Sequence, residues 1–310
     1  MIQTLNLFSH VQKKSVTLAE QAYAQVEGFS HLQDKLTQSF SINGKASSTL
    51  NNYLRCLAHL ALHYKQSPEK LSVENIEDYL YFCQKQHKTP SESFFKHTIF
   101  GLRAAYKVMG MEAKRVALPQ IKRDQKLPTV LSQQEVKRLL KAPKYLKHRL
   151  ILGVLYGCGL RSYELCNLKL ADIDFDRKTV FIPKKKGKVD RYVPLSKHLV
   201  RGLKKYIETE NPHLYLFNSQ VTKDGNPRGL TTNGIRWIIK ENRSKIGCNK
   251  KITAHMLRHS FATHLLEYGV DLVSLKELLG HAHIEMTLTY LHVANLPSKA
   301  KFSPLDRLYA

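Results

Sequence analysis

The sequence predicts a mainly α-helical protein that also contains one small antiparallel β-sheet. Apolar residues recur at helical spacing over most of the 310 residues, which is the pattern of helices packed around a core. Between residues 172 and 195 the spacing changes to the alternation that is typical of short strands. A polar and basic segment with a proline at each end, residues 119–128, separates two such regions. We therefore expect a helical domain followed by a mixed α/β domain.

Three to four helices are expected in the first domain, and three of them have a clear pattern. The first begins at Ser47, and the second follows Ser72. Proline interrupts helices, so the first ends before Pro68 and the second before Pro90. The third ends near Gly110. The expected boundaries are an N-terminal extension without a clear pattern at 1–29, a helical domain at 30–118, a linker at 119–131, a second domain at 132–295 and a tail at 296–310.

The second domain is expected to open on a capping box, formed by Ser132 and Glu135. An apolar helix then ends in a turn marked by two glycines, and Arg161 lies where this turn meets the next helix. A charged side chain beside so apolar a helix needs an anionic partner if it is buried. The alternative is a surface arginine near a turn. Farther on, Trp237 is expected to anchor the core, because tryptophan is a large apolar side chain.

The charge balance indicates a polyanionic partner. The chain has 49 Lys and Arg against 25 Asp and Glu, a net charge of +24. A membrane partner would require a basic amphipathic helix or an apolar span of about 18 residues, and the sequence shows no such span. Nucleic acid is therefore the expected partner, with a basic surface kept for solubility as the alternative. A run of lysines on a predicted hairpin turn, residues 184–188, suits a DNA groove, although such runs are usually solvated loops.

The cysteines and the N-terminus predict a cytoplasmic protein. The five cysteines are odd in number and form no C-x-x-C pair, as in a protein of a reducing compartment. Residues 1–14 lack the continuous apolar stretch and cleavage site of a secretory signal.

The sequence lacks the motifs of several common catalytic chemistries. His255 and His259 have the spacing of the zinc motif H-E-x-x-H, but Met256 replaces its glutamate and Arg258 would repel a cation. The chain also has no G-x-S-x-G motif and no phosphate-binding loop motif. We expect no metal and no cofactor.

The remaining polar groups suit phosphoryl transfer without a metal. Two arginines can clamp the non-bridging oxygens of a phosphodiester, which is the role that Mg²⁺ has elsewhere. A tyrosine, with a pKa of about 10, can attack the phosphorus if cations or a base assist it. A lysine can protonate the departing hydroxyl.

Four segments of the chain resemble the motif boxes of the tyrosine recombinases, the family of the Xer, Cre and phage integrase proteins. LYGCGLRSYELCNLKLADID resembles the first box, and KKGKVDRYVPL resembles the β-hairpin box. HMLRHSFATHLLEYG and LLGHAHIEMTLTYLHV resemble the two halves of the second box. The family's catalytic residues match, in chain order, Arg161, Lys186, His255, Arg258, His281 and Tyr290. Lys184, Lys185 and Lys188 lie close to Lys186, and Ser162-Tyr163 and Met286 depart from the usual pattern.

The resemblance implies a SAM-like core-binding domain followed by a mixed α/β catalytic domain. It implies that Tyr290 forms a 3′-phosphotyrosyl link, that Arg161 and Arg258 hold the phosphate, and that His281 hydrogen-bonds one of its oxygens. Lys186 would protonate the leaving oxygen, and His255 would act as acid and base on Tyr290. The implied partners are double-stranded DNA and three further copies of the chain, a homotetramer that recombines two duplexes through a Holliday junction. Such an enzyme would be associated with the nucleoid.

Two alternatives remain open from the sequence. A type IB topoisomerase-like enzyme would use the same chemistry to relax DNA as a monomer. A regulator could bind DNA on this fold without catalysis. The tail at 296–310 is expected either to dock on a neighbouring protomer or to pack on its own domain.

Overall fold

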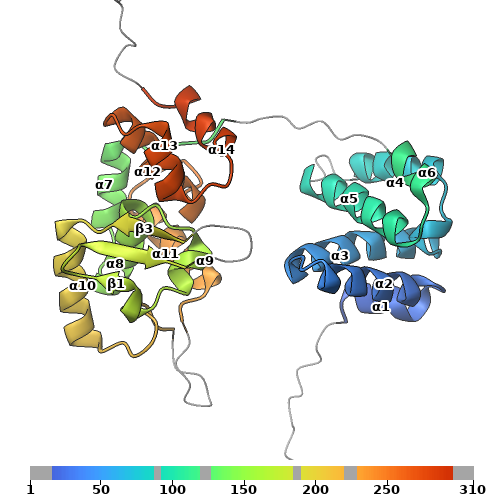
Figure 1. Ribbon diagram of the computed structural model, residues 1–310, viewed down its shortest axis with the longest axis horizontal. Helices are drawn as coiled ribbons and strands as arrows, with labels where there is room; N and C mark the ends of the chain where they lie inside the picture. The colour runs from blue at the N-terminus through green and yellow to red at the C-terminus, as the bar shows by residue number, and fades with distance from the viewer. Residues whose placement is uncertain (1–15, 87–91, 119–126, 184–189, 220–228, 296–310) are drawn as a thin grey trace, which may run out of the picture. The chain divides into compact units, whose positions relative to one another are not determined.

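The computed structural model describes residues 16–86, 92–118, 127–183, 190–219 and 229–295, in two compact units that divide after Asp124. Each of the two units drawn in Figure 1 has its own hydrophobic core. The predicted hairpin tip at 184–188, with Lys186, and the predicted tail at 296–310 lie outside the described residues.

The first unit is a bundle of helices around an apolar and aromatic core. Its elements are α1 (Leu18–Gln25), α2 (Phe29–Ile42), α3 (Ser47–Tyr64), the 3-10 turn η1 (Pro68–Lys70), α4 (Val73–Gln86), α5 (Glu92–Val108) and α6 (Glu112–Ala117). Helices α3, α4 and α5 confirm three predicted helices, and α3 begins at Ser47 as predicted, with Ala46 in the capping position. Ala22 and Val26 belong to the same core as Leu57 and Tyr106, so the bundle begins before residue 30.

The second unit places helices around a three-stranded antiparallel sheet. Its elements are α7 (Gln133–Lys141), α8 (Leu146–Gly157), α9 (Ser162–Cys166), η2 (Leu170–Asp172), β1 (Ile173–Asp174), β2 (Thr179–Ile182), β3 (Arg191–Pro194), α10 (Lys197–Glu210), α11 (Thr232–Lys245), α12 (Ala254–Glu267), α13 (Leu272–Leu279), α14 (Glu285–Leu288) and η3 (Thr289–His292). The strand order is β1-β2-β3, which confirms the predicted small sheet.

Several helices of the second unit begin at a capping residue. Ser132 and Glu135 form the predicted capping box at α7, and Ser196 caps α10. Thr253 accepts a hydrogen bond from the Met256 amide at the start of α12, and Asp271 caps α13. A side-chain oxygen that satisfies an otherwise unpaired amide fixes where each helix begins.

Helix α12 runs through the interior of the second unit. It lies beside α13 (Figure 1). One side packs into the main core through Leu257, and another packs with α13 and η3 through Phe261, Leu279 and Tyr290. Because α12 is covered on several sides, Arg258 and Ser260 in its first two turns are buried, whereas His255 stays exposed.

The expected role of Trp237 is wrong. Its side chain is 57% exposed on α11, and its ring meets the edge of the His148 ring with centroids 5.7 Å apart. The apolar face of α11 is instead supplied by Ile235, Ile238 and Ile239, which leaves Trp237 on the outer side.

Candidate active site

Arg258 is almost fully buried at the centre of the site. Its side chain is 1% exposed, and its guanidinium donates to the carbonyl oxygens of Gly159, at 2.7 Å, and Leu279. Burial is the main cause that lowers the Arg258 pKa, to about 9, so the group stays charged at neutral pH. These bonds use two of the five N–H groups of a guanidinium, which leaves donors for an oxyanion.

Gly159 allows Arg258 to reach its backbone. The glycine has a φ of +60°, and a Cβ there would lie 2.4 Å from the Phe261 ring. No L side chain fits that position without moving α12, so the glycine turn predicted before Arg161 also brings α8 and α12 together.

Glu164 joins three arginines into one cluster. Arg191 binds both carboxylate oxygens, at 3.0 and 2.8 Å, and Arg161 binds one at 3.0 Å. Arg258 lies 3.9 Å away. Burial would raise the Glu164 pKa, but the hydrogen bonds and charge of Arg191, with smaller contributions from Arg161 and Arg258, outweigh it and lower the pKa to about 2. Three cations against one carboxylate leave two net positive charges.

Strand β3 supplies Arg191 from an inward position. Its burial alternates with that of Tyr192, and its guanidinium nitrogen Nε donates to the Leu278 carbonyl at 2.9 Å. Arg161 also reaches α13, with a 3.4 Å bond to the Leu279 carbonyl. The end of α13 is therefore bound to both β3 and the start of α9. A cleft of about 760 Å³ opens beside it, with Arg191 and His281 among its lining residues.

Tyr290 lies in the packed interior beside this cluster. It is 3% exposed, and its hydroxyl is 3.0 Å from Nδ1 of His259. The ring of His281 stacks against it, with centroids 6.3 Å apart and planes at 13°. Burial raises the Tyr290 pKa, and the charges of Arg258 and Arg161 act in the opposite direction. The hydroxyl therefore carries its proton at neutral pH.

Two histidines follow one another along α12. The rings of His255 and His259 meet edge to face, with centroids 4.3 Å apart. His255 is exposed at the mouth of the site, and desolvation, Arg258 and Arg161 lower its pKa. Desolvation first, then His255 and Arg258, lower the His259 pKa to about 4. Both imidazoles are therefore neutral at neutral pH.

His281 is placed by the glycine that ends α13. Gly280 has a φ of +60°, and the next residue, His281, is 8% exposed. Its Nδ1 lies 2.9 Å from the Thr287 hydroxyl, which fixes the orientation of the ring. Within the described residues, no group of His, Cys, Asp or Glu is arranged to hold a metal ion.

The structure brings five of the six expected residues into one region. Arg161, His255, Arg258, His281 and Tyr290 are linked through the contacts above, and Lys186 lies outside the described residues. Sequence reasoning missed Glu164, Arg191 and the contact of His259 with Tyr290. Glu164 stands three residues after Arg161 at a helix start, where a capping carboxylate is common. Arg191 interrupts an otherwise apolar strand face, which is a second usable sign.

The sequence profile of the phage integrase family matches residues 129–296. Over 268 residues the chain is 32% identical to tyrosine recombinase XerA of Pyrococcus horikoshii, across 85% of this chain and 90% of that protein. The chain belongs to the phage integrase family. It is also 34% identical over 274 residues to tyrosine recombinase XerD of Listeria innocua, across 83% and 91% of the two chains. The predicted family and the predicted enzyme class, a tyrosine recombinase acting in site-specific recombination, are thereby confirmed.

Solved structures share the fold of this recombinase. The Tn1549 transposon integrase in complex with transposon right end DNA aligns with a TM-score of 0.65 at 18% identity, over 90% of this chain and 99% of that chain. A lambda integrase dimer bound to a COC′ core site aligns with a TM-score of 0.68 at 18% identity, over 88% and 80%. These likenesses confirm the predicted fold class.

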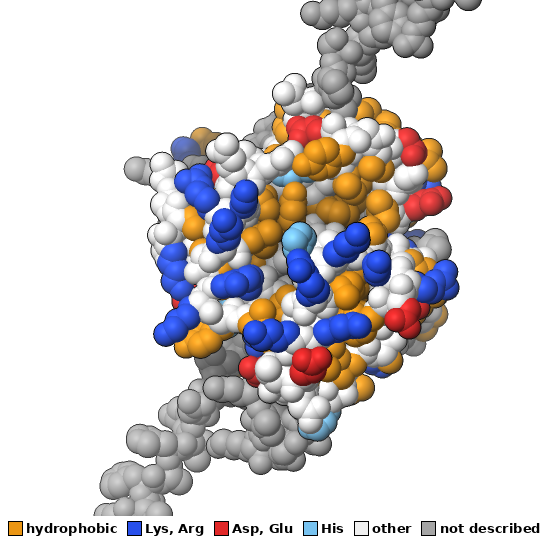
Figure 2. All heavy atoms as spheres, turned by 90° about the vertical axis from the view of Figure 1, so that its left-hand side faces the viewer, with side chains coloured by type: hydrophobic (Ala, Val, Ile, Leu, Met, Phe, Trp, Pro, Cys, Tyr) orange, Lys and Arg blue, Asp and Glu red, His pale blue; other side chains and the backbone are white. Residues whose placement is uncertain are grey.

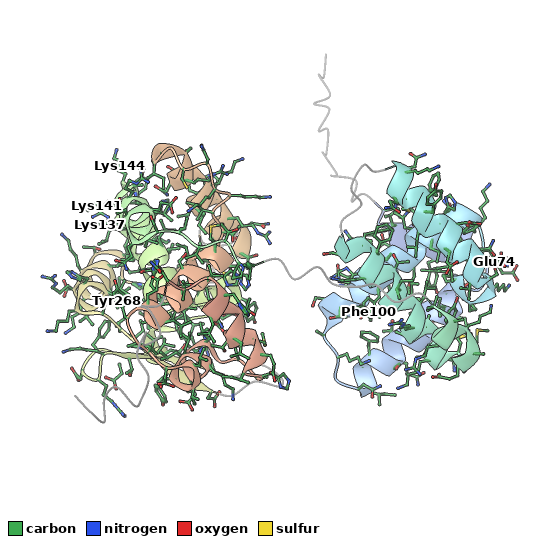
Figure 3. The ribbon with its side chains drawn as sticks, turned by 90° about the horizontal axis from the view of Figure 1, so that it is seen from above. Glu74, Phe100, Lys137, Lys141, Lys144 and Tyr268 are labelled. Atoms are coloured by element: carbon green, nitrogen blue, oxygen red, sulfur yellow. The ribbon has the colours of Figure 1, made fainter. Side chains whose placement is uncertain are left out.

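Basic side chains are exposed on the second unit. Figure 2 shows many Lys and Arg side chains on the face where α7 and α10 lie. Lys137, Lys141 and Lys144 follow one another along α7 and the turn after it (Figure 3), and all three are exposed. Among the described helices, none combines the length and apolar character that a membrane crossing requires.

Proposed function

We propose that this recombinase cuts and rejoins DNA through a 3′-phosphotyrosyl link on Tyr290. The observation that carries the proposal is the position of a buried tyrosine beside a cluster with two net positive charges. A phosphodiester carries one negative charge, and the pentacoordinate transition state of its displacement carries two. A site with two excess positive charges stabilises the transition state more than the bound substrate, which is the requirement for catalysis.

Each of the six residues has a proposed role. Arg161 and Arg258 hold the non-bridging oxygens, and His281 donates a hydrogen bond to one of them. Lys186 protonates the leaving 5′ oxygen. His255, an exposed member of the set, contacts the His259 ring and takes part in the proton transfer at Tyr290. The link to Tyr290 conserves the energy of the broken bond, so rejoining needs no nucleotide cofactor.

The proposed substrate is double-stranded DNA, and the proposed assembly is a homotetramer on two duplexes that exchange strands through a Holliday junction. The net charge of +24 supports a polyanionic substrate. Solved relatives of this fold include XerH bound to its difH substrate. We propose a cytoplasmic location at the nucleoid, where this substrate is found. Membership of the integrase family favours recombination over topoisomerase-like relaxation or regulation without catalysis.

Covalent capture from genomic DNA tests this function. The wild-type chain and Tyr290→Phe are each incubated with sheared host DNA and denatured in SDS, and the DNA that remains on protein is sequenced. We expect the wild-type chain to retain DNA with a shared short sequence and the phenylalanine variant to retain none while still binding DNA. Covalent capture by the phenylalanine variant would contradict the assignment of Tyr290.

The captured sequence then supplies a defined duplex for the remaining measurements. If about 6–10 phosphates are neutralised, affinity should fall about 10³–10⁵-fold between about 50 and 200 mM salt. Two labelled duplexes should yield a four-way junction, and a plasmid should not be relaxed by a single protomer. Relaxation without junctions would favour the topoisomerase-like alternative.

A further inference from the structure

We propose that His259 is the general base that takes the proton of Tyr290 during strand cleavage and returns it during rejoining. The proposal rests on the proposed function of Tyr290 and adds a residue outside the six that the family resemblance supplied. It moves the proton-transfer role from His255 to its neighbour one helical turn away.

Geometry selects His259. The hydroxyl of Tyr290 lies 3.0 Å from its Nδ1, within the range for proton transfer along a hydrogen bond. The two rings are close, with centroids 5.5 Å apart at 55°. His255 contacts the ring of His259 at 4.3 Å. The half-buried His259 therefore contacts the Tyr290 hydroxyl, and the exposed His255 lies against the His259 ring.

Tyr290 needs such a base. Burial raises its pKa, so the arginine charges do not convert it to a phenolate before attack. A buried phenol without a base would have to lose its proton to water that is excluded from the packed interior. His259 offers a neutral acceptor, because desolvation and the nearby charges keep its pKa at about 4.

The proton moves only as the new bond forms. As Oη bonds to phosphorus, the phenolic proton becomes strongly acidic and passes to Nδ1 of His259. The P–O5′ bond breaks at the same time, and O5′ takes a proton from a second donor, which the proposed function identifies as Lys186. In rejoining, a 5′ hydroxyl attacks phosphorus and passes its proton to the now neutral amine of Lys186. The Oη–P bond breaks at the same time, and the imidazolium of His259 returns its proton to Oη of Tyr290.

The charged and titratable groups around His259 set its response to DNA. Arg258 and His255 face it from α12, and Tyr290 faces it from η3, with His281 stacked behind the tyrosine and Arg161 acting on the same hydroxyl. A bound phosphate opposes the two arginine charges. We therefore expect DNA to raise the His259 pKa from its low resting value, which makes the ring a stronger base only when substrate is present.

The same helix contains a matched control. His264 lies five residues farther along α12, and its Nδ1 is 2.9 Å from the Tyr156 hydroxyl. This second histidine–tyrosine pair has similar geometry, and α8 supplies its tyrosine. His264→Asn therefore makes the same chemical change in the same helix without touching Tyr290.

The test measures single-turnover adduct formation by the full chain. The substrate is a duplex of the captured sequence with either a normal phosphate or a sulfur atom in place of O5′. We expect His259→Asn to slow cleavage of both substrates by about 10²-fold or more, because asparagine can accept the hydrogen bond but cannot hold the proton. His264→Asn should stay within about threefold of wild type, and Lys186→Ala should be rescued by sulfur, a leaving group that needs no proton.

The pH profile separates a base from a positioning residue. Wild-type cleavage should be nearly flat between about pH 6 and 9, whereas cleavage by His259→Asn should rise about tenfold per pH unit, as expected when hydroxide must remove the proton. Three results for His259→Asn would each overturn the proposal. They are cleavage of both substrates within threefold of the wild-type rate, a flat pH profile, and rescue of cleavage by the sulfur substrate. A wild-type cleavage rate that rises tenfold per pH unit would also overturn the proposal, and this measurement requires no variant. Adduct formation by Tyr290→Phe would instead defeat the proposed function.

Discussion

The two units differ in the charged side chains that they bury. The first buries Glu69, which accepts a hydrogen bond from Ser67, whereas the second buries arginines around a carboxylate. The core of the first unit is built from residues such as Leu57, Tyr79 and Tyr106, whose burial stabilises the fold directly. The second unit has an apolar core too, but it also buries Arg258 and places Glu164 and Arg191 against it. Removing charges from water costs several kcal/mol per ion unless every partner is in place. The second arrangement is therefore expected to be kept for chemistry rather than for stability.

The largest effect should come from removing the central arginine. Arg258→Met should slow adduct formation at saturating DNA by about 10²–10³-fold, because a donor to the transition state is lost. It should also destabilise the second unit by about 1–3 kcal/mol, since the carbonyls of Gly159 and Leu279 lose a buried donor. Arg149→Met is the control, because Arg149 also donates to a carbonyl, that of Pro143, but is exposed. Equal loss of activity in both variants would contradict a specific role for Arg258.

A core substitution in the first unit should act on stability alone. Leu57→Ala removes a fully buried side chain and should cost about 2–5 kcal/mol in the free energy of unfolding, as measured by urea denaturation. Folded protein should retain the pH profile of wild-type cleavage. A changed pH profile in Leu57→Ala would contradict the view that the core of the first unit affects stability and not the chemistry of cleavage.

Glu164 should make stability depend on acid. Its folded pKa of about 2 lies below the ordinary 4.5, so its contribution is present above about pH 4.5 and is lost as the pH falls toward 2. Glu164→Gln should remove up to about 3 kcal/mol of that dependence, seen as similar urea midpoints at pH 5 and pH 3. Glu241→Gln, in the partly exposed pair with Lys245, should keep the wild-type slope. Equal slopes for all three proteins would show that the cluster is not coupled to folding.

The smallest effect should come from Trp237. An exposed ring at the edge of His148 contributes about 0.5–1.5 kcal/mol, whereas a buried tryptophan would contribute about 3–5. Thermal unfolding of Trp237→Ala should therefore show a shift of a few degrees at most. A loss of about 3–5 kcal/mol in stability would instead support the core role that the sequence predicted for Trp237.

Local patterns were enough to predict helices such as α3, α7 and α8, because periodicity and caps act within a few residues. The start of α1 had the same kind of sign, a capping box from Thr17 to Glu20, and was overlooked. The pairing of Glu164 with Arg191 spans 27 residues, and the contact of His259 with Tyr290 spans 31. Such contacts depend on how elements pack, and the lone sequence does not fix that packing.

Of the 15 tyrosines of the chain, we propose that Tyr290 receives the phosphate. The most direct test digests the covalent protein–DNA complex with nuclease and protease and locates the remaining nucleotide by mass spectrometry. We predict a 3′-phosphonucleotide on the peptide that contains Tyr290. A nucleotide on any other residue would contradict the account.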